Sequence, residues 1–427
     1  MTWKKSHDIA DVSISMEGQE VTLGGWIEDV RVMGKVTFAT LRDHTGMAQA
    51  VAKGDAAGGV AGAGRQSAVG ITGTIQGTRA RGLEYEVLVS SIEVLGRAEH
   101  PLPVDPIGRQ GSNIDTRLDH RALDMRNQRT AAIFRIRHRA LQYARRHLDS
   151  ARYTEITTPK IIGSASEGGA DLFSMEYFGK SAYLAQSPQL YKEQMTLGLG
   201  RVFEIASFYR AEKSHTGRHL SEFTSVDIEG AFMDCGDVMA ELESLVRGMI
   251  THVAGSCAAE LGELGTGLRD PGPFERLTYR DCVKELRGMG EDVEEGGDLL
   301  DSHLRVLGGA HPGYYFITGW PTDLKPFYIM GSEADPAVSE SFDLQHGHLE
   351  LSSGGTRIHR REDLAGRLAA KGLDPAQFGP HLESFGWGMP PHSGWGLGLD
   401  RLVAVLAGLD NVREAVLYPR DPDRLTP

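Results

Sequence analysis

The sequence predicts an α+β fold with two domains: a small β-barrel, then a larger domain that mixes helices and strands. Three observations support this. Residues 1–100 contain five short apolar runs separated by Gly-rich turns. Residues 130–151 repeat apolar positions with helical spacing, and residues 201–229 read as two strands joined by a polar loop. A chain of 427 residues is long enough for two or three domains, each with its own core.

The bulk composition is that of an ordinary globular protein, with 40% hydrophobic and 24% charged residues. The three cysteines, Cys235, Cys257 and Cys282, show neither metal-ligand spacing nor even pairing, which favours a reducing, cytoplasmic setting. The N-terminus lacks the apolar core of a signal peptide, and no apolar run approaches the roughly 20 residues of a membrane helix. The net charge of −13 argues against a nucleic-acid partner, but local basic clusters at 135–146 and 357–361 leave one open.

The first hundred residues are expected to form a five-stranded barrel of the OB type, which binds single-stranded nucleic acid by stacking bases on aromatic side chains. Phe38 and Gln49 lie on neighbouring expected strands and could stack on a base and bond its edge; barrel core is the ordinary alternative for Phe38. Residues 53–66 are too rich in Gly and Ala for a strand, so a loop or weak helix is expected there. The five expected strands are Val21–Val30, Val36–Leu41, Ala48–Ala52, Ala68–Ile75 and Leu83–Val94.

The composition changes between the barrel and the larger domain. A proline-spaced run at 99–106 predicts an extended linker. The segment after it is rich in Arg and Asp, which either contact an RNA backbone or form internal salt bridges. A strongly amphipathic helix is then expected from Thr130 to Ala151, followed by a strand over 153–162 that meets Pro159. The charged residues in question are Arg117, Asp119, Arg121 and Arg126.

Residues 201–229 organise the larger domain as an expected hairpin with a long cationic tip. Arg210 closes the first strand, and Asp227 and Glu229 share one face of the second because alternate residues of a strand point the same way. Fixed cations beside fixed carboxylates suit a ligand that carries both phosphates and an amine. An ordinary hairpin with solvated charges is the alternative, and it is disfavoured because other stretches complete the same site.

Two stretches before the hairpin add candidate ligand groups. Residues 163–173 are small and flexible around Glu167, which fits a loop that closes over a substrate, or a plain surface loop. Residues 182–195 place several polar side chains and a lysine around a helix start, where a carboxylate is favoured. These side chains are Gln186, Ser187, Gln189 and Lys192.

After the hairpin, a helix is expected over residues 234–259 and strands over 314–330. Residues 261–313 are acidic and Gly-rich and are expected to form a surface module without a role that the sequence indicates. Glu350 and Ser353 then supply two oxygen donors. Mg²⁺ takes few protein oxygens and shares itself with phosphates, so this pair suits a Mg²⁺–ATP complex.

Arg357 and Arg401 complete the set of candidate cations. Arg357 follows Gly354 and Gly355, which let the backbone approach a ligand. Arg401 lies in the first turn of the last long helix, directly after GLGLD. The glycines of that turn, Gly398 among them, are by themselves a weak signal, because many helices begin with glycine. The order SSGG and then GLGLDR is more specific.

These stretches together resemble the three motifs of the class II aminoacyl-tRNA synthetases. The helix and strand over 130–162 resemble motif 1. The hairpin resembles motif 2 through FYRAE, RHLSEFT and DIE, and GLGLDR resembles motif 3. The likeness is greatest to the compact aspartyl enzymes of archaea and eukaryotic cytosol and covers essentially the whole chain. It implies an anticodon-binding OB domain (1–100), a hinge (101–130) and a catalytic domain (131–427) with an antiparallel sheet flanked by helices.

The resemblance implies a two-step reaction that consumes ATP. Aspartate attacks the α-phosphate to give aspartyl-adenylate, and the aspartyl group then moves to the 3′ end of tRNA-Asp. Such chemistry needs positioning and charge neutralisation rather than a protein nucleophile. The resemblance makes Arg210 and Arg401 the catalytic residues, with Phe223 and Arg401 on opposite faces of the adenine. The implied ATP ligands are Arg210, Glu212, Arg218, His219, Leu220, Phe223, Glu350, Gly398 and Arg401.

The same resemblance implies how aspartate and the metal are held. Lys192 and Arg357 would pair with the side-chain carboxylate, and two cations around one carboxylate would reject asparagine. Asp227 and Glu167 would hold the ammonium group. Glu350 and Ser353 would be the Mg²⁺ ligands. The implied aspartate ligands are Glu167, Gln189, Lys192, Arg210, Asp227, Ser353 and Arg357.

In the barrel, the resemblance implies that Phe38 and Gln49 contact the central anticodon base, with Glu86 as a looser match. Glu28 and Gly82 stand where strict enzymes carry Trp and Lys and relaxed enzymes carry His and Pro or Gly. Gly82 fits the relaxed type and Glu28 fits neither. We therefore expect an enzyme that also charges tRNA-Asn.

The implied partners are tRNA, aspartate, ATP and a second copy of the chain, joined through motif 1, with no membrane. Pattern alone does not separate the motif 1 helix from an ordinary core helix. The nearest alternative is an asparaginyl-tRNA synthetase, which lacks the lysine found here as Lys192. A catalytically decayed RNA-binding protein is a more distant alternative, and it would lack some of Arg210, Glu350, Arg357 and Arg401, all of which are present.

Overall fold

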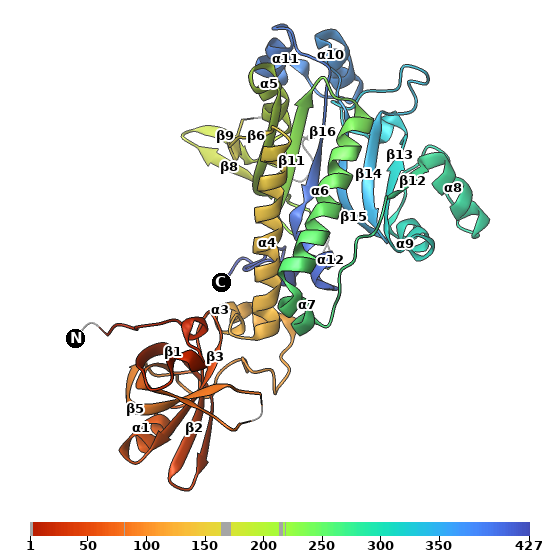
Figure 1. Cartoon of the computed structure of the whole chain (residues 1–427). Helices are drawn as coiled ribbons and strands as arrows, with labels where there is room; N and C mark the ends of the chain where they lie inside the picture. The colour runs from red at the N-terminus through yellow and green to blue at the C-terminus, as the bar shows by residue number, and fades with distance from the viewer. Residues whose placement is uncertain (1–2, 81, 164–171, 213–216, 218) are drawn as a thin grey trace. The chain divides into compact units, whose positions relative to one another are not determined.

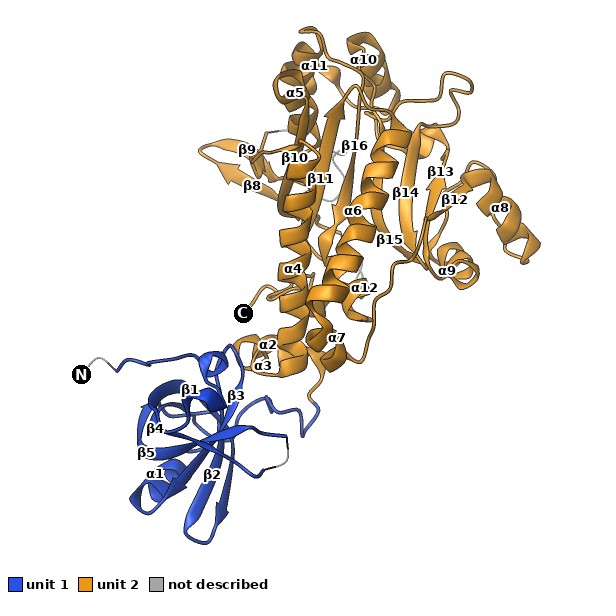
Figure 2. Ribbon diagram, viewed as in Figure 1, with its two compact units in different colours: residues 1–111 blue, residues 112–427 orange. Residues whose placement is uncertain are grey.

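The computed structural model describes residues 3–427 except 81, 164–171, 213–216 and 218 (Figure 1). The chain forms two compact units, residues 1–111 and residues 112–427 (Figure 2). The boundary between the two units lies after Gly111, a few residues beyond the proline-spaced run at 99–106. Within the described residues, no helix has the length and apolar character needed to cross a membrane.

The first unit is a closed barrel with strand order β1-β2-β3-β5-β4, which confirms the predicted five-stranded barrel. Alternate side chains fill its interior, as Val21 and Leu23 do, because successive strand residues point to opposite faces. Helix α1 (Asp55–Ala63) lies where a loop or weak helix was expected, and its Val60 and Ala63 join the barrel core. The strands are β1 (Glu20–Met33), β2 (Val36–Arg42), β3 (Met47–Lys53), β4 (Ala68–Gly77) and β5 (Tyr85–Gly96).

The second unit is built on an eight-stranded sheet with the order β12-β13-β14-β15-β16-β11-β10-β6. The inner strands are antiparallel, as expected, whereas the edge strands β12 and β6 each run parallel to their neighbour. The predicted α+β fold class, with a class II synthetase sheet, is confirmed. The strands are β6 (Thr154–Glu155), β10 (Arg201–Tyr209), β11 (Glu222–Ala231), β12 (Glu275–Thr278), β13 (Tyr314–Thr318), β14 (Ser341–His346), β15 (Leu349–Thr356) and β16 (His392–Gly398).

Three helices cover one face of this sheet and form the main core with it: α4 (Gln128–Ser150), α6 (Cys235–Ser256) and α12 (Leu399–Ala407) (Figure 1). Both long helices begin at side-chain caps. Asn127 accepts hydrogen bonds from the first turn of α4, and Asp234 forms a capping box on α6. The predicted helices are thus confirmed. The apolar stripe of α4 comprises the buried residues Ile133, Ile136, Ala140, Ala144 and Leu148.

Smaller elements surround the opposite face of the sheet. A three-stranded sheet has the order β7-β9-β8, and helix α5 lies beside β10 and β11. The remaining elements of this unit are α2 (Ile114–Asp119), α3 (Arg121–Asp124), β7 (Ile161–Ile162), β8 (Ser174–Tyr177), β9 (Lys180–Leu184), α5 (Gln189–Leu199), α7 (Ala258–Leu264), α8 (Tyr279–Gly288), α9 (Asp301–Ala310), α10 (Arg361–Ala370) and α11 (Gly379–Phe385).

Two stretches expected to form strands contain less strand than expected, and each contains a proline. The strand expected over 153–162 consists of β6 and β7, with Pro159 between them, because proline has no N–H to donate to a ladder. The stretch 314–330 likewise forms only β13, and Pro321 follows it. The acidic stretch 261–313 adds β12 to the edge of the sheet and packs α8 and α9 around a small core of their own.

The charged segment after the unit boundary forms internal salt bridges for three of its four residues. Arg117 contacts Asp124 at 3.1 Å, and Arg121 is 1% exposed with Asp124 at 2.9 Å. Asp119 pairs with Arg424. Burial excludes contact with an RNA backbone for Arg121, whereas the side chains of Arg117 and Asp119 remain 24% and 54% exposed.

Candidate active site

A cavity of about 350 Å³ lies on the face of the eight-stranded sheet opposite α4 and α6. Its walls come from α5, β10, β11, β14, β15, β16 and α12. All described residues predicted to bind aspartate, ATP or metal line this one cavity. Glu167 and Arg218 lie outside the described residues. The predicted residues that line it are Gln189, Lys192, Arg210, Glu212, His219, Leu220, Phe223, Asp227, Glu350, Ser353, Arg357, Gly398 and Arg401.

The register of the sheet determines which residues line the base of the cavity. Asp343, Ser353, Gly396 and Asp227 are direct neighbours on β14, β15, β16 and β11, so they form one row across the sheet. Glycine leaves room in this row for the charged groups beside it. A Cβ on Gly396 would lie 3.0 Å from Oδ1 of Asp227. The glycines that precede α12 therefore have a packing role on β16.

A β-bulge brings the two predicted metal ligands to one side of the sheet. Residues three apart on a regular strand point to opposite faces, which would separate Glu350 from Ser353. In β15, Ser352 pairs with Leu344 and Glu350 pairs with Gln345, so Leu351 is the extra residue. Leu351 enters the core, while Glu350 and Ser353 both line the cavity.

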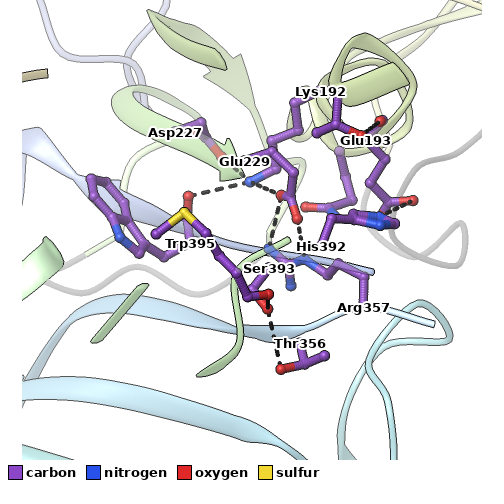
Figure 3. Close-up of polar contacts among 12 residues, drawn as sticks. Lys192, Glu193, Asp227, Glu229, Thr356, Arg357, His392, Ser393 and Trp395 are labelled. Atoms are coloured by element: carbon purple, nitrogen blue, oxygen red, sulfur yellow. Dashed lines mark hydrogen bonds and ion pairs between the residues drawn. The ribbon is translucent and has the colours of Figure 1, made fainter. Parts of the chain in front are cut away.

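Two buried cations and two buried carboxylates lie together at the end of the cavity beside α5 (Figure 3). Lys192 Nζ donates to Oδ1 of Asp227 at 3.1 Å and to the Trp395 carbonyl at 3.2 Å, and lies 3.4 Å from Oε2 of Glu229. Arg357 donates to Glu229 through Nε at 3.0 Å and Nη2 at 3.3 Å. All four charged side chains are almost completely buried.

Glu229 is the shared anion of this cluster, and the sequence alone assigned it no role beyond its place beside Asp227. It faces Arg357 in a bidentate contact, the strongest arrangement for a guanidinium and a carboxylate. Burial by itself would lower the pKa of Arg357, but Glu229 outweighs burial and raises that pKa. The four charges cancel, so a ligand entering this end meets fixed donors and acceptors in a neutral environment.

The motif 2 residues form the opposite end of the cavity. Arg210 lies 3.6 Å from Glu212, and its guanidinium lies over the ring of Phe223, 5.3 Å from the ring centre. His219 contacts the other oxygen of Glu212 at 3.7 Å. Arg401 reaches this end from α12 and donates to the Glu350 carbonyl at 2.8 Å. Cations at this end and a flat aromatic ring suit a nucleotide with phosphates.

Arg137, which sequence reasoning did not single out, joins α4 to this end of the cavity. Its guanidinium pairs with Asp400 and donates to Oγ1 of Thr224 at 2.8 Å. The Thr224 N–H in turn donates to Asp400 at 2.7 Å. Desolvation raises the pKa of Asp400, which Arg137 opposes. The contact fixes the start of α12, and with it the backbone that carries Arg401.

Asp343 is a metal-ligand candidate that the sequence analysis did not identify, because it lies between the apolar residues Phe342 and Leu344. Its Oδ2 accepts from Lys325 at 2.7 Å, while its buried Oδ1 has no hydrogen-bond partner among the described residues. Glu350, whose side chain is 45% exposed, lines the same cavity. Two mutually repelling carboxylates with Ser353 in the same row fit a hard divalent cation, which would remove that repulsion.

The barrel places the three predicted anticodon residues on its outer surface. Phe38 and Gln49 are on adjacent strands and face outward, and Phe38 is not part of the barrel core. Gln49 donates to Glu86 at 3.0 Å. Glu86 also accepts from Gln76 at 2.7 Å and Thr78 at 2.9 Å. A half-exposed aromatic ring beside an ordered amide can stack on one base and bond its edge.

The two predicted discrimination residues differ in what surrounds them. Glu28 is the extra residue of a β-bulge on β1, and its carboxylate contacts Arg42 at 2.8 Å. The guanidinium of Arg42 lies over the Trp26 ring. Gly82 has φ +83° and open space where a Cβ would be. Glu28 is therefore neutralised by its neighbour, and Gly82 leaves a gap.

Comparisons with known proteins place the chain in a family. The family described as "tRNA synthetases class II (D, K and N)" matches residues 113–422, and the one described as "OB-fold nucleic acid binding domain" matches residues 21–95. The chain belongs to the class II tRNA synthetases of the D, K and N type. Its predicted likeness to the compact aspartyl enzymes is also confirmed.

Three relatives illustrate the match. The aspartate–tRNA(Asp/Asn) ligase of Archaeoglobus fulgidus is 45% identical over 98% of this chain and 99% of its own length. The aspartate–tRNA(Asp) ligase of Thermoplasma acidophilum is 41% identical over 96% of this chain and 97% of its own. The solved asparaginyl-tRNA synthetase of Pyrococcus horikoshii, with asparaginyl-adenylate, is 32% identical, with a TM-score of 0.93 and full coverage of both chains.

Replacing Glu229 with Gln tests the buried cluster. The variant leaves Arg357 and Lys192 short of one buried negative charge, so we expect the free energy of unfolding to fall by about 3–5 kcal/mol. The control is Glu295→Gln, whose contact with Arg287 is 3.6 Å long between side chains 70% and 48% exposed. That change should cost less than about 1 kcal/mol. Urea denaturation measures both, and equal small losses would show that the cluster is not what holds this end of the sheet.

Proposed function

We propose that this chain is an aspartate–tRNA ligase that activates L-aspartate with ATP and transfers it to tRNA. The buried Lys192–Asp227–Glu229–Arg357 cluster carries this proposal. Lys192 and Arg357 only donate hydrogen bonds, which suits a side-chain carboxylate and not an amide, whose NH₂ would face them. The relatives named as aspartate–tRNA ligases match this chain over nearly their whole length. An asparaginyl enzyme is the weaker alternative because of Lys192.

Aspartate binds with its side chain toward the cluster. Lys192 and Arg357 receive the side-chain carboxylate, and Asp227 and Gln189 receive the ammonium group, as does Glu167. Ser353 and Arg210 lie toward the α-carboxylate, which is the nucleophile. Arg210 neutralises charge on the α-phosphate during attack. Because the reacting groups belong to the two substrates, the protein acts by orientation and electrostatics.

ATP occupies the motif 2 and motif 3 end of the cavity. Phe223 stacks on one face of the adenine and Arg401 on the other. Glu212 accepts from the adenine edge, while Arg218 and His219 hold the outer phosphates. The backbone at Leu220 and Gly398 lines the nucleotide. This assignment rests on the position of the described residues in one cavity.

Mg²⁺ would be held by Glu350 and Ser353, and we add Asp343 to these ligands. The unpartnered Oδ1 of Asp343 and the exposed Glu350 carboxylate on the same cavity support this assignment. When bound, the ion would neutralise phosphate charge beside Arg401.

Removal of either carboxylate tests this metal site. In Glu350→Gln and in Asp343→Asn we expect the Mg²⁺ concentration for half-maximal ATP–pyrophosphate exchange to rise at least about tenfold, because a ligand charge is lost. The exposed Glu333→Gln variant is the control. An unchanged Mg²⁺ requirement in both variants would exclude these residues as ligands.

The barrel unit would bind the anticodon and the second unit would carry catalysis, with the segment around residues 101–130 as the hinge. Phe38 stacks on the central anticodon base, and Gln49, oriented by Glu86, bonds its edge. We further propose that the enzyme is relaxed and also charges tRNA-Asn. The open space at Gly82 and the neutralised Glu28 support this, since neither excludes a different third base. The Archaeoglobus relative carries the Asp/Asn description.

Charging assays with labelled aspartate test function and specificity together. We expect wild-type protein to aspartylate tRNA-Asp and tRNA-Asn at comparable rates and to transfer no asparagine. Gly82→Lys should suppress tRNA-Asn charging about tenfold or more, because a lysine fills the gap beside the anticodon. The control is Gly82→Ala, which has the same backbone strain at φ > 0 as Gly82→Lys but lacks the long side chain. It should charge both tRNAs. Failure to transfer aspartate to either tRNA would refute the activity, and charging of tRNA-Asp alone would refute only the relaxed specificity.

We also propose that two copies assemble through the edge that ends in β6. This two-residue strand has β10 on one side only. Next to the start of β10, the side chains of Leu199 and Phe232 are 49% and 81% exposed. The Ala231 N–H binds the Gly200 carbonyl, so these two apolar residues belong to neighbouring turns. An open strand edge with apolar neighbours favours pairing with another chain.

Sedimentation analysis tests the dimer. We expect wild-type protein to sediment at about twice 46.5 kDa. Phe232→Asp places a charge in the proposed interface and should weaken dimerisation by at least about tenfold. Leu300→Asp changes a side chain that is 60% exposed at the start of α9 and should leave the mass unchanged. A monomeric wild-type protein would refute the proposal.

A further inference from the structure

A fully buried carboxylate lies behind the amino-acid end of the cavity, on the inner face of α5. Glu193 is 0% exposed, and its Oε1 accepts from Nε2 of Gln189 at 2.5 Å. Its Oε2 lies 3.2 Å from Nε2 of His381 and 4.0 Å from Nε2 of His392. Figure 3 shows Glu193 and His392 next to the Lys192 cluster. Neither Glu193 nor His381 lines the cavity, so the ligand cannot touch them.

The partners of the two imidazoles indicate where their protons lie. Nδ1 of His392 is 2.8 Å from the Pro390 carbonyl, which only accepts, so this nitrogen carries a proton. Nδ1 of His381 is 3.1 Å from Nε2 of Gln194, which also donates to the Leu190 carbonyl. Nδ1 of His381 is therefore the acceptor, which leaves the proton on Nε2, the nitrogen that lies 3.2 Å from Glu193 without hydrogen-bond geometry.

The carboxylate between these rings is held in its ionised form. Burial alone would raise the pKa of Glu193, but the contacts with His381 and His392 outweigh burial and lower that pKa. The Glu193 carboxylate raises the pKa of His392 in turn. An ionised carboxylate has no proton to donate, so toward Gln189 it can act only as an acceptor.

This contact fixes which way the Gln189 amide points. Its NH₂ is committed to Glu193, four residues on along the same helix face. The amide oxygen is then the atom left for the cavity, which Gln189 lines. Lys192 lies on the same face of α5 and reaches Asp227. The Gln189 oxygen and the Asp227 carboxylate thus give this part of the cavity two acceptors for one positive group.

We propose that Glu193, supported by His381, is a positioning residue that locks the Gln189 amide with its oxygen toward the ligand and so makes the cavity selective for the α-ammonium group. The inference rests on the proposed aspartate activation. A glutamine at position 193 could donate as well as accept, so the Gln189 amide could then turn over at little cost. A buried carboxylate removes that freedom, although its burial is itself unfavourable.

ATP–pyrophosphate exchange with Glu193→Gln tests the role. We expect the KM for aspartate to rise about tenfold, the effect of losing one hydrogen bond to a charged group, with kcat within about twofold. Succinate is aspartate without its amino group, and its inhibition constant against aspartate should not change. The loss would then be confined to ligands that carry the ammonium group, which a general loosening of the pocket would not produce.

Two further variants make the test independent of how well Glu193→Gln folds. When Glu193→Gln is added to the Gln189→Ala variant, the KM for aspartate should not change further, because Glu193 acts through Gln189. His381→Phe keeps Glu193 but removes the imidazole that lies 3.2 Å from its carboxylate, and should raise the same KM about threefold. Glu241→Gln, which breaks a comparable contact with His147 away from the cavity, is the control and should leave both constants unchanged.

The outcomes separate the two claims. Wild-type protein that does not exchange pyrophosphate with aspartate refutes the proposed function. Active wild type with an unchanged KM for aspartate in Glu193→Gln refutes the positioning role. Equal weakening of aspartate and succinate also refutes it, because the residue would then act only on the shape of the pocket.

Discussion

Burial of four charges on one sheet face is the constraint on which the site depends. Lys192, Arg357, Asp227 and Glu229 are each costly to bury alone, so each needs the others in place. The charged groups have room only because β16 carries glycine beside them. A Cβ on Gly394 would lie 2.3 Å from Oε2 of Glu229. The opposite face of the same strand places the fully buried Trp395 in the main core. Apolar packing on one face thus fixes the polar geometry on the other.

Sheet register extends this order to the nucleotide end. The bulge at Leu351 turns Glu350 to the same side of the sheet as Ser353, and Asp343 on β14 pairs directly with Ser353. Lys325 already neutralises one of these carboxylates, Asp343, and the Mg²⁺ proposed above would neutralise the other. Arg137 then ties the start of α12 to the core helix α4, so the position of Arg401 follows from packing far from the ligand.

Helix α5 shows how one element serves two functions. Lys192 points from it to the sheet, while Glu193, the next residue, points to His381 and His392. The first side chain takes part in the pocket and the second holds a neighbour of the pocket in one orientation. The barrel repeats this arrangement on a smaller scale, because Glu86 orders Gln49 while Phe38 offers the ring. In both units a carboxylate accepts a hydrogen bond from a glutamine amide and so fixes its orientation.

The sequence by itself determined the elements and the chemistry: five barrel strands, the long helices, the hairpin and the cations that a phosphate and a carboxylate require. Periodicity is local, so the apolar stripe of α4 predicted that helix without any tertiary contact, whereas its Asn127 cap became visible only in the structure. Only the tertiary structure decided the roles of Glu229, Asp343, Arg137 and Glu193. Their partners lie far away in the sequence, or on the next turn of a helix whose orientation was unknown. The role of a buried charged residue depends on the groups that surround it, and strand register and core packing determine which groups those are.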